Sequence, residues 1–322
     1  MKALTDRQLR DCIHPDEFGR FILALVFVGP GILIVVGLFL LVWFGPFFLS
    51  DTDVALIALA AKIFWLIIVI LLFLLIIWFV TIVLEAYHRA YSAEITRAAL
   101  PELEETIREV CDALSYNRDE IRAFLVQDET YGARYRIWYR DILEINSTLA
   151  EAVYEYDAPG ELKFEIASHV GQATARLLRQ YLIARTFQFV AKMPLLNVFV
   201  LPWIRSTVYT ADQIALAATG DLRSVLDALS ARIVGKDLAS IVAIIGWIEQ
   251  HQHLRWSFLS LMMRLLSQEP HPVDRIANIL CFAAETIPSQ FSDEMQQLPD
   301  SHRERVLQIL DKSRHARRRF NP

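Results

Sequence analysis

Two long apolar stretches near the N-terminus restrict the possible folds of this chain more than any other feature. Residues 21–49 contain no charged side chain, and residues 54–84 contain only one, Lys62. A helix needs about 20 apolar residues to cross the hydrocarbon core of a bilayer. Both stretches reach that length, and the acidic link between them, residues 51–53, is very short. The sequence therefore predicts a transmembrane helical hairpin, with helices at about 21–49 and 54–84.

Basic residues flank this predicted hairpin, whereas its link carries only acids. Lysine and arginine concentrate in loops on the cytoplasmic side of membrane helices. The first stretch is too long for a signal peptide and shows no small-residue cleavage pattern. We therefore expect an integral membrane protein, embedded in the lipid bilayer, with both termini and the main domain in the cytoplasm. The flanking basic residues are Lys2, Arg7, Arg10 and Arg20 before the hairpin, and Arg89 and Arg97 after it.

Length, charge and cysteine content narrow the class of protein further. The chain has 322 residues, enough for one membrane region and one globular domain. Its net charge of −5 gives no sign of a nucleic-acid partner. Cys12, Cys111 and Cys281 are scattered, which fits a reducing compartment and argues against a disulfide framework or a cysteine zinc site. The basic tail at 312–319 is interpreted either as a contact with anionic lipid or as a solvated terminus.

The part that follows the hairpin has the pattern of a mostly helical α+β domain with a small β-sheet. Pro101 is suited to the first turn of a helix. Residues 121–127 have strand-like composition, 128–132 are turn-like, and 135–146 alternate large and polar side chains, which predicts a β-hairpin or a sheet edge. From Glu161 onward the pattern is helical. The expected division of the chain is 1–20 as a cytoplasmic segment, 21–84 as the hairpin, 85–290 as the main domain, and 291–322 as a helix with the basic tail.

One helical segment carries a motif with a recognisable form. Residues 161–172 read ELKFEIASHVGQ. This resembles the active-site helix of the HtpX-like membrane zinc metallopeptidases, which include the CAAX prenyl endopeptidases and typically read E-L-x-F-x-x-[GA]-H-E-x-G-H. On this alignment Ser168 and Gln172 replace the two zinc histidines, and His169 replaces the general-base glutamate.

Two further segments support the resemblance. Residues 203–221 are similar to the family pattern R-x-x-E-Y-x-A-D-R-x-G-L with the A-T-G-D-like stretch that follows it. Val208 stands where the family has its third zinc ligand. Residues 271–276 (HPVDRI) resemble a further H-P and R-I signature, with a shorter spacer, and His271 before Pro272 is interpreted as a helix start or a turn and not as a ligand. The resemblance covers about residues 95–285, and it implies a zincin-like cytoplasmic domain on a membrane hairpin in a bacterial inner membrane. The matching residues of the second segment are Arg205, Tyr209, Ala211, Asp212, Leu216 and Thr219–Asp221.

The resemblance implies a domain without its catalytic metal. A catalytic zinc needs three protein ligands and an open position for water. Ser168 and Gln172 are poor zinc ligands, Val208 has no donor atom, and His169 is not the expected base. We therefore expect no catalytic residue and no cofactor of the family type.

A relocated metal site is the alternative that keeps chemistry. Glu165 and His169 are one helical turn apart on the same face, and Asp212 lies close to the metal helix in the family. These three residues define the alternative zinc site. The competing interpretation is that His169 is a polar residue bonded to Glu165 or Asp212. Ser168 and His169 do not form a nucleophile pair, because adjacent helical residues do not face each other.

These observations lead to a hypothesis of a catalytically inactive metallopeptidase homologue. The framework residues Gly171, Arg205 and Asp212 match the family, so a cleft for an extended polypeptide is expected to persist, and such a cleft captures chains by pairing with a strand edge. The expected partner is a protein, either a membrane protein or an active peptidase. An active metallopeptidase with a rearranged metal site and a structural subunit of a membrane complex stay open as alternatives.

Overall fold

The computed structural model describes most of the chain outside residues 28–91 and 237–266. Its continuous described ranges are 1–27, 90–128, 132–137, 141–156, 159–177, 197–236 and 269–298, and single positions elsewhere are also described. The chain divides into two compact units, residues 1–22 with 92–322 and residues 23–91. Each unit is described by itself below.

The unit of residues 23–91 contains most of the predicted transmembrane hairpin, the larger part of which lies outside the described residues. Its described positions are helical, and large apolar side chains among them are exposed, for example Phe64 at 61% and Phe79 at 60%. Among the positions that are described, no helix is both long enough and apolar enough to cross a membrane. The hairpin is thus not supported by the described part of the chain and stays a prediction.

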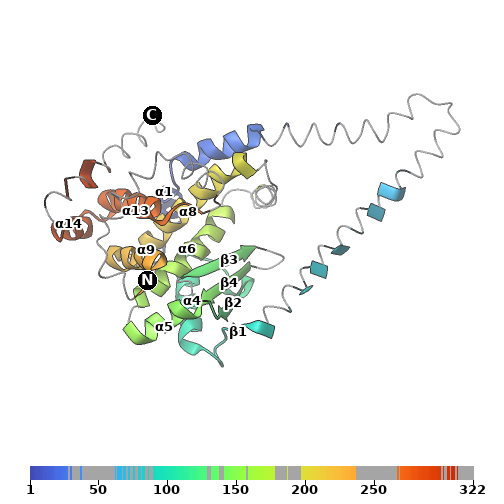
Figure 1. The fold of residues 1–322 in the computed structure, drawn as a ribbon, viewed down its shortest axis with the longest axis horizontal. Helices are drawn as coiled ribbons and strands as arrows, with labels where there is room; N and C mark the ends of the chain where they lie inside the picture. The colour runs from blue at the N-terminus through green and yellow to red at the C-terminus, as the bar shows by residue number, and fades with distance from the viewer. Residues whose placement is uncertain are drawn as a thin grey trace. The chain divides into compact units, whose positions relative to one another are not determined.

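The other unit is mostly helical with one small sheet, which confirms the expected α+β class. Figure 1 shows the sheet on one side of this unit and α9, α13 and α14 on the other, with α6 and α8 between them. The labelled helices are α1 (Asp6–Asp11), α4 (Pro101–Ala113), α5 (Ser147–Tyr156), α6 (Pro159–Leu177), α8 (Asn197–Thr219), α9 (Leu222–Val234), α13 (Pro272–Thr286) and α14 (Pro288–Gln296).

The sheet has the strand order β1-β2-β4-β3, with bounds Ala93–Glu94, Ile121–Val126, Asp141–Asn146 and Ala133–Ile137 in that order. β2 pairs with β4 in parallel, and β3 pairs with β4 in antiparallel orientation. The sequence predicted a β-hairpin or a sheet edge across residues 121–146, with a turn at 128–132. A small sheet is present, but the hairpin is formed by β3 and β4, and β2 pairs with β4 in parallel.

Helix α6 is the central element of this unit. Apolar side chains all around it are buried, which is typical of a helix enclosed by neighbours on every side. Gly171 permits a close approach to α8, because a Cβ at this position would lie 3.0 Å from the Ile214 Cγ2 atom. The buried apolar residues of α6 include Leu162, Phe164, Ile166, Ala167 and Val170.

Local sequence sets the residues at which α4 and α13 begin, as predicted. Pro101 is the first residue of α4. His271 is the N-cap of α13: its side chain accepts a hydrogen bond from the Val273 N–H, and Pro272 follows at the first helical position. Proline fits there because the N–H that it lacks has no partner within the helix. The His271-Pro272 pair thus acts as a helix start.

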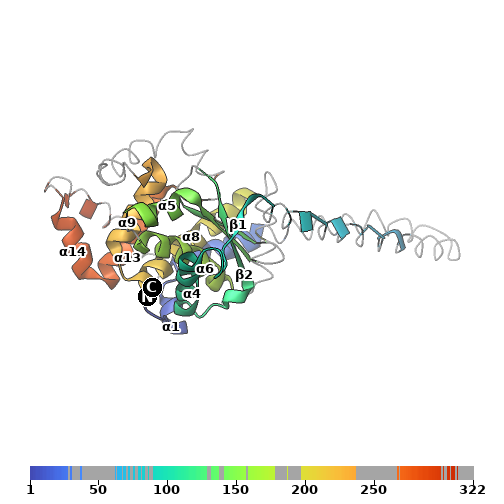
Figure 2. The ribbon, with the colours of Figure 1, turned by 90° about the horizontal axis from the view of Figure 1, so that it is seen from below.

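Residues 1–22 pack into the same unit as residues 92–322. Leu4, Leu9 and Cys12 are buried in its hydrophobic core. The Thr210 hydroxyl on α8 accepts a hydrogen bond from the His14 N–H at 2.9 Å and donates one to the buried Glu17 carboxylate. The N-terminal segment is therefore an integral part of the domain, which the sequence pattern did not reveal. Figure 2, like Figure 1, shows α13 and α14 on the side of this unit away from β1 and β2, with α6 and α8 between them.

Candidate functional site

Ser168, Gln172 and Val208, the positions that the resemblance aligns with zinc ligands, lie where α6 packs on α8. Ser168 Oγ donates a hydrogen bond to Asp212 Oδ1 at 2.9 Å, and Gln172 Nε2 donates one to Thr207 Oγ1 at 3.2 Å. Successive turns of α6 therefore contact successive turns of α8, which run in opposite directions. Val208, half-buried, follows Thr207 and lies one turn before Asp212 on α8. The structure thus brings Ser168, Gln172 and Val208 into one region.

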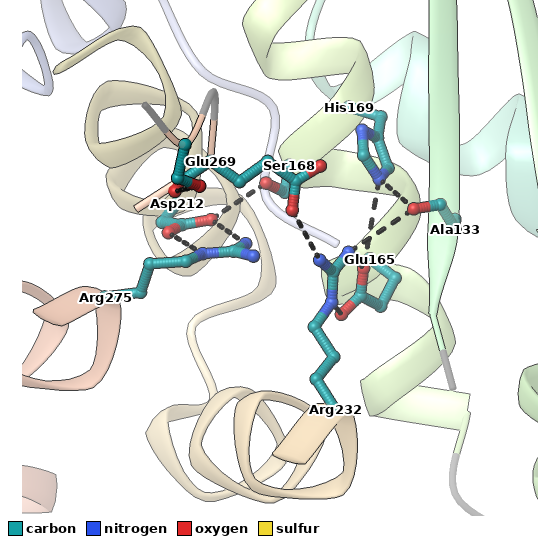
Figure 3. Close-up of polar contacts among 9 residues, drawn as sticks. Ala133, Glu165, Ser168, His169, Asp212, Arg232, Glu269 and Arg275 are labelled. Carbon is teal, nitrogen blue, oxygen red and sulfur yellow. Dashed lines mark hydrogen bonds and ion pairs between the residues drawn. The ribbon is translucent and has the colours of Figure 1, made fainter. Parts of the chain in front are cut away.

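An ion pair between Asp212 and Arg275 lies beside these positions. Arg275, from α13, donates from Nε to Oδ2 at 2.8 Å and from Nη2 to Oδ1 at 2.7 Å. Both side chains are buried, and Figure 3 shows Ser168 directed at the same carboxylate. Burial by itself would lower the pKa of Arg275, but the Asp212 carboxylate outweighs it and raises that pKa. Arg275 is therefore a permanent cation at this position.

A second ion pair joins α6 to α9. Arg232 donates from Nε to Glu165 Oε1 at 2.7 Å and from Nη2 to Glu165 Oε2. Burial would raise the pKa of Glu165, but the charge of Arg232 and its hydrogen bonds more than offset that and lower it. Arg232 also lies 3.9 Å from the exposed Glu269 carboxylate.

Gly132 makes room for the Arg232 guanidinium at the start of β3. Its φ of +135° lies in a region that L side chains rarely adopt, and a Cβ there would lie 3.2 Å from Arg232 Nε. The next residue, Ala133, offers its carbonyl oxygen to Arg232 Nη2 at 3.4 Å. The backbone at this end of β3 is therefore shaped to receive a guanidinium group.

His169 points at β3, away from Asp212 (Figure 3). Its Nε2 lies 2.8 Å from the Ala133 carbonyl oxygen and 4.0 Å from Glu165 Oε2. A carbonyl only accepts hydrogen bonds, so Nε2 carries the proton. Burial, with the positive charge of Arg232, lowers the pKa of His169 to about 4 against the opposing effect of Glu165. His169 is thus a neutral donor at neutral pH, and its ion-pair contact with Glu165 is long.

This geometry predicts how His169 shapes the pH dependence of folding. Its pKa of about 4 in the folded protein lies below the ordinary 6.5, so between these values the unfolded chain holds more protons. Stability from His169 is complete above pH 6.5 and is lost as the pH falls towards 4, by up to roughly 3 kcal/mol. In His169→Gln, an uncharged donor replaces the imidazole, and the fall in unfolding free energy between pH 7 and pH 5 is expected to shrink by roughly 2 kcal/mol. Denaturant titrations at the two pH values measure it.

The measurements for this variant stay above pH 4.5, because the lowered pKa of Glu165 adds a separate loss of stability below its ordinary value of 4.5. Subtracting the profile of the variant from that of the wild-type protein removes the contributions of other histidines. Parallel profiles would show that His169 has an ordinary pKa in the folded protein, and would contradict its burial beside Arg232.

The residues of this region do not fit a zinc ion. Both oxygens of Asp212 and both oxygens of Glu165 are engaged by arginines, whose positive charges oppose a cation. The relocated set of Glu165, His169 and Asp212 is divided: His169 approaches Glu165, whereas Asp212 bonds to Ser168 and Arg275. In the part of the chain that the structure describes, no group of three or more histidine, cysteine or acidic residues is placed to hold a metal.

The predicted framework residues have different roles. Gly171 gives the close α6–α8 contact, and Asp212 is the anion that Arg275 and Ser168 share. Arg205 is half-buried on α8, two residues before Thr207. Arg232 was missed in the sequence, because it lies in no motif. The one sequence signal near Arg232 was Gly132, a glycine in a turn-like stretch, which adopts a positive φ in the structure.

Comparison with protein-family models, with curated proteins and with solved structures finds no match for this chain. The class of protein therefore rests on the residues and the geometry given above, and the resemblance to the HtpX-like metallopeptidases enters the next section as a proposal.

Proposed function

We propose that this chain is a membrane-anchored, catalytically inactive homologue of the HtpX-like metallopeptidases that binds a protein partner at the cytoplasmic face of the membrane. One observation carries the proposal: each polar side chain at the former ligand and base positions is hydrogen-bonded to another group of the domain. Ser168 bonds to Asp212, Gln172 to Thr207, and His169 to the Ala133 carbonyl. None of these contacts resembles an activated nucleophile or a metal ligand set.

The structure supports a binding role through the edge strand β3. The Asn146 N–H donates to the Gly132 carbonyl oxygen, so residue 132 belongs to a hydrogen-bonded pair with β4. Such pairs alternate along antiparallel strands. The backbone groups of Ala133, Tyr135 and Ile137 therefore point away from β4, towards the outer edge of the sheet. An extended peptide adds to an edge of this kind as a further strand.

His169 and Arg232 set one end of the proposed binding edge. The Ala133 carbonyl already accepts their hydrogen bonds, so an added strand begins its pairing at Tyr135. The same strand would then pass beside the emptied site of α6. The domain thereby keeps the peptide-binding edge of a peptidase and lacks the groups that would cut the bound chain.

The edge is tested with a photo-crosslinking residue at position 135 of the full-length protein in its native membrane. We expect one reproducible crosslinked partner, and we expect Ile137→Pro to abolish the crosslink by removing an outward N–H without touching the β4 ladder. Ile137→Val keeps that N–H and is expected to keep the crosslink. A crosslinker at Ser289, exposed on α14, is the matched control and should capture nothing.

Other outcomes select the alternative functions. Equal crosslinking in the proline and valine variants would exclude strand addition. Crosslinks from Phe64 but not from position 135 would favour a structural subunit. Stoichiometric metal in the purified protein, together with chelator-sensitive cleavage of casein, would replace the proposal with an active metallopeptidase.

A further inference from the structure

Exposed apolar side chains concentrate on two helices that pack on each other, the helix that begins at residue 16 and the first turn of α8. In the described part of the unit formed by residues 1–22 and 92–322, six large apolar side chains are exposed, and four of them are on the helix that begins at residue 16 or on the first turn of α8. Those four are Phe18 at 65%, Ile22 at 40%, Val198 at 36% and Phe199 at 38%; the other two are Ile233 and Leu307. We call the four residues the apolar foot.

The two helices that carry the apolar foot are packed side by side. Glu17 contacts Thr210, whereas Arg20 reaches the Pro202 carbonyl at 3.5 Å, so the helices run in opposite directions. The Phe21 and Trp203 rings lie 5.9 Å apart between them, and Phe187 packs against both rings. An aromatic cluster therefore fills the interface beneath the foot and holds the two helix ends together.

Packing within the domain does not explain why the helix that begins at residue 16 has an apolar outward face. Phe18 and Ile22 are one turn apart and lie on the same face. The charged pair of Arg20 and Asp16, 3.0 Å apart, is only partly exposed beside them. Exposed apolar patches bordered by polar residues mark sites of contact with membranes or other proteins.

The residues that follow this helix in the sequence indicate what its apolar face contacts. The helix described at residues 16–27 passes directly into the uncharged stretch that ends at Leu49. Under the proposed membrane anchorage, on which this inference rests, Ile22 is the first apolar turn before the hydrocarbon core. A helix at that depth exposes its apolar face to the boundary between lipid headgroups and acyl chains.

We propose that the apolar foot inserts into the bilayer interface, so that the folded domain itself contacts the membrane in addition to its anchor. Helix α8 connects the foot to the former metal site: Val198 and Val208 are ten residues apart, which is at most about 15 Å along a helix. The emptied site is thereby held within that distance of the membrane surface. The partner segment that the domain recognises is accordingly a juxtamembrane segment of another membrane protein.

Environment-sensitive probes on the full-length protein test this contact. Cysteine replaces Val198 or Phe18, carries an NBD label, and the protein is reconstituted into phosphatidylcholine–phosphatidylglycerol vesicles with or without doxyl-labelled lipid. The native cysteines are buried, and burial raises the pKa of Cys12 and of Cys111 to about 12, which limits labelling there. We expect both probes to be blue-shifted and quenched by roughly twofold or more, as for a side chain at the interface. A label at Ser289, on the exposed face of α14, should show neither effect.

The outcomes separate the foot from the anchor. Protein that floats with vesicles but shows no more quenching at positions 198 and 18 than at 289 would overturn the foot and leave the anchor intact. Protein that does not float with vesicles would overturn both. Blue-shifted emission without lipid quenching, reversed when the protein-to-lipid ratio is lowered, would assign the face to a second copy of the chain and overturn the bilayer contact.

Discussion

Replacing Arg275 with methionine is expected to lower the free energy of unfolding by roughly 3–5 kcal/mol, the range for removing one member of a buried ion pair. Asp212 is fully buried and would retain only the Ser168 hydroxyl as a partner. A buried carboxylate without a cation loses its hydration and gains nothing in exchange. Chemical denaturation of the detergent-solubilised full-length protein, followed by circular dichroism, measures the loss.

A control variant and a second-site variant distinguish the loss of a buried ion pair from a general effect of replacing an arginine. Arg223, also paired with two carboxylates, has a side chain that is 52% exposed, and Arg223→Met should cost less than about 1 kcal/mol. Adding Asp212→Leu to Arg275→Met removes the stranded charge and should recover most of the loss, since buried ion pairs are often replaceable by apolar residues. A double variant no more stable than Arg275→Met would show that Asp212 is not buried as an ion.

The sequence predicted those parts of the fold that depend on neighbouring residues. Pro101 and the His271-Pro272 pair marked helix starts correctly, because capping and proline geometry act within one helical turn. The parallel pairing of β2 with β4 was missed. It depends on the order of the strands in the sheet, which the alternation of side chains within one strand does not determine. The packing of residues 1–22 was missed for the same reason: their partners, such as Thr210, are far away in the sequence.

The same distinction applies to the candidate site. The sequence related Ser168, Gln172, Val208 and Asp212 to one another through motifs, and the structure places them in one helix interface. The sequence did not reveal Arg232. This residue reaches the site from α9 and is recognisable only by its contacts with Glu165 and Ala133. A motif relates residues at fixed spacing within a segment, whereas Arg232 lies outside every segment that carries the resemblance.

Arg275 and Arg232 connect neighbouring helices in the way that a metal ion connects its ligands. A bound zinc ion contributes folding free energy by joining its ligands. Here Arg275 joins α13 to α8, and Arg232 joins α9 to α6 and to the start of β3. Each arginine uses the paired N–H groups that match a carboxylate. The helices around Ser168 and Glu165 are therefore linked by ion pairs.

Placing the zinc-site residues of the HtpX-like metallopeptidases at four positions of this chain is expected to create a zinc site. The variant combines Ser168→His, His169→Glu, Gln172→His and Val208→Glu. Positions 168 and 172 already face α8, and position 208 is next to the residue that Gln172 contacts. Two histidines and a glutamate supply three ligands and leave a fourth position open, as in catalytic zinc sites. We expect about one zinc per chain, and stabilisation of about 2.7 kcal/mol when free zinc is at 100 times its dissociation constant.

The third ligand provides the decisive control, because it comes from α8 and not from the motif on α6. A variant with the three α6 substitutions and Val208 unchanged has only two histidine ligands, and its zinc should be lost during dialysis against a weak chelator that leaves the four-substitution variant loaded. Equal zinc retention in both variants would show that position 208 lies outside the metal sphere. A four-substitution variant that folds normally and binds no zinc would mean that α6 and α8 do not have the spacing of a zincin. The resemblance to the metallopeptidases would then fail, whereas a role for the β3 edge in binding would still stand on the geometry of that strand.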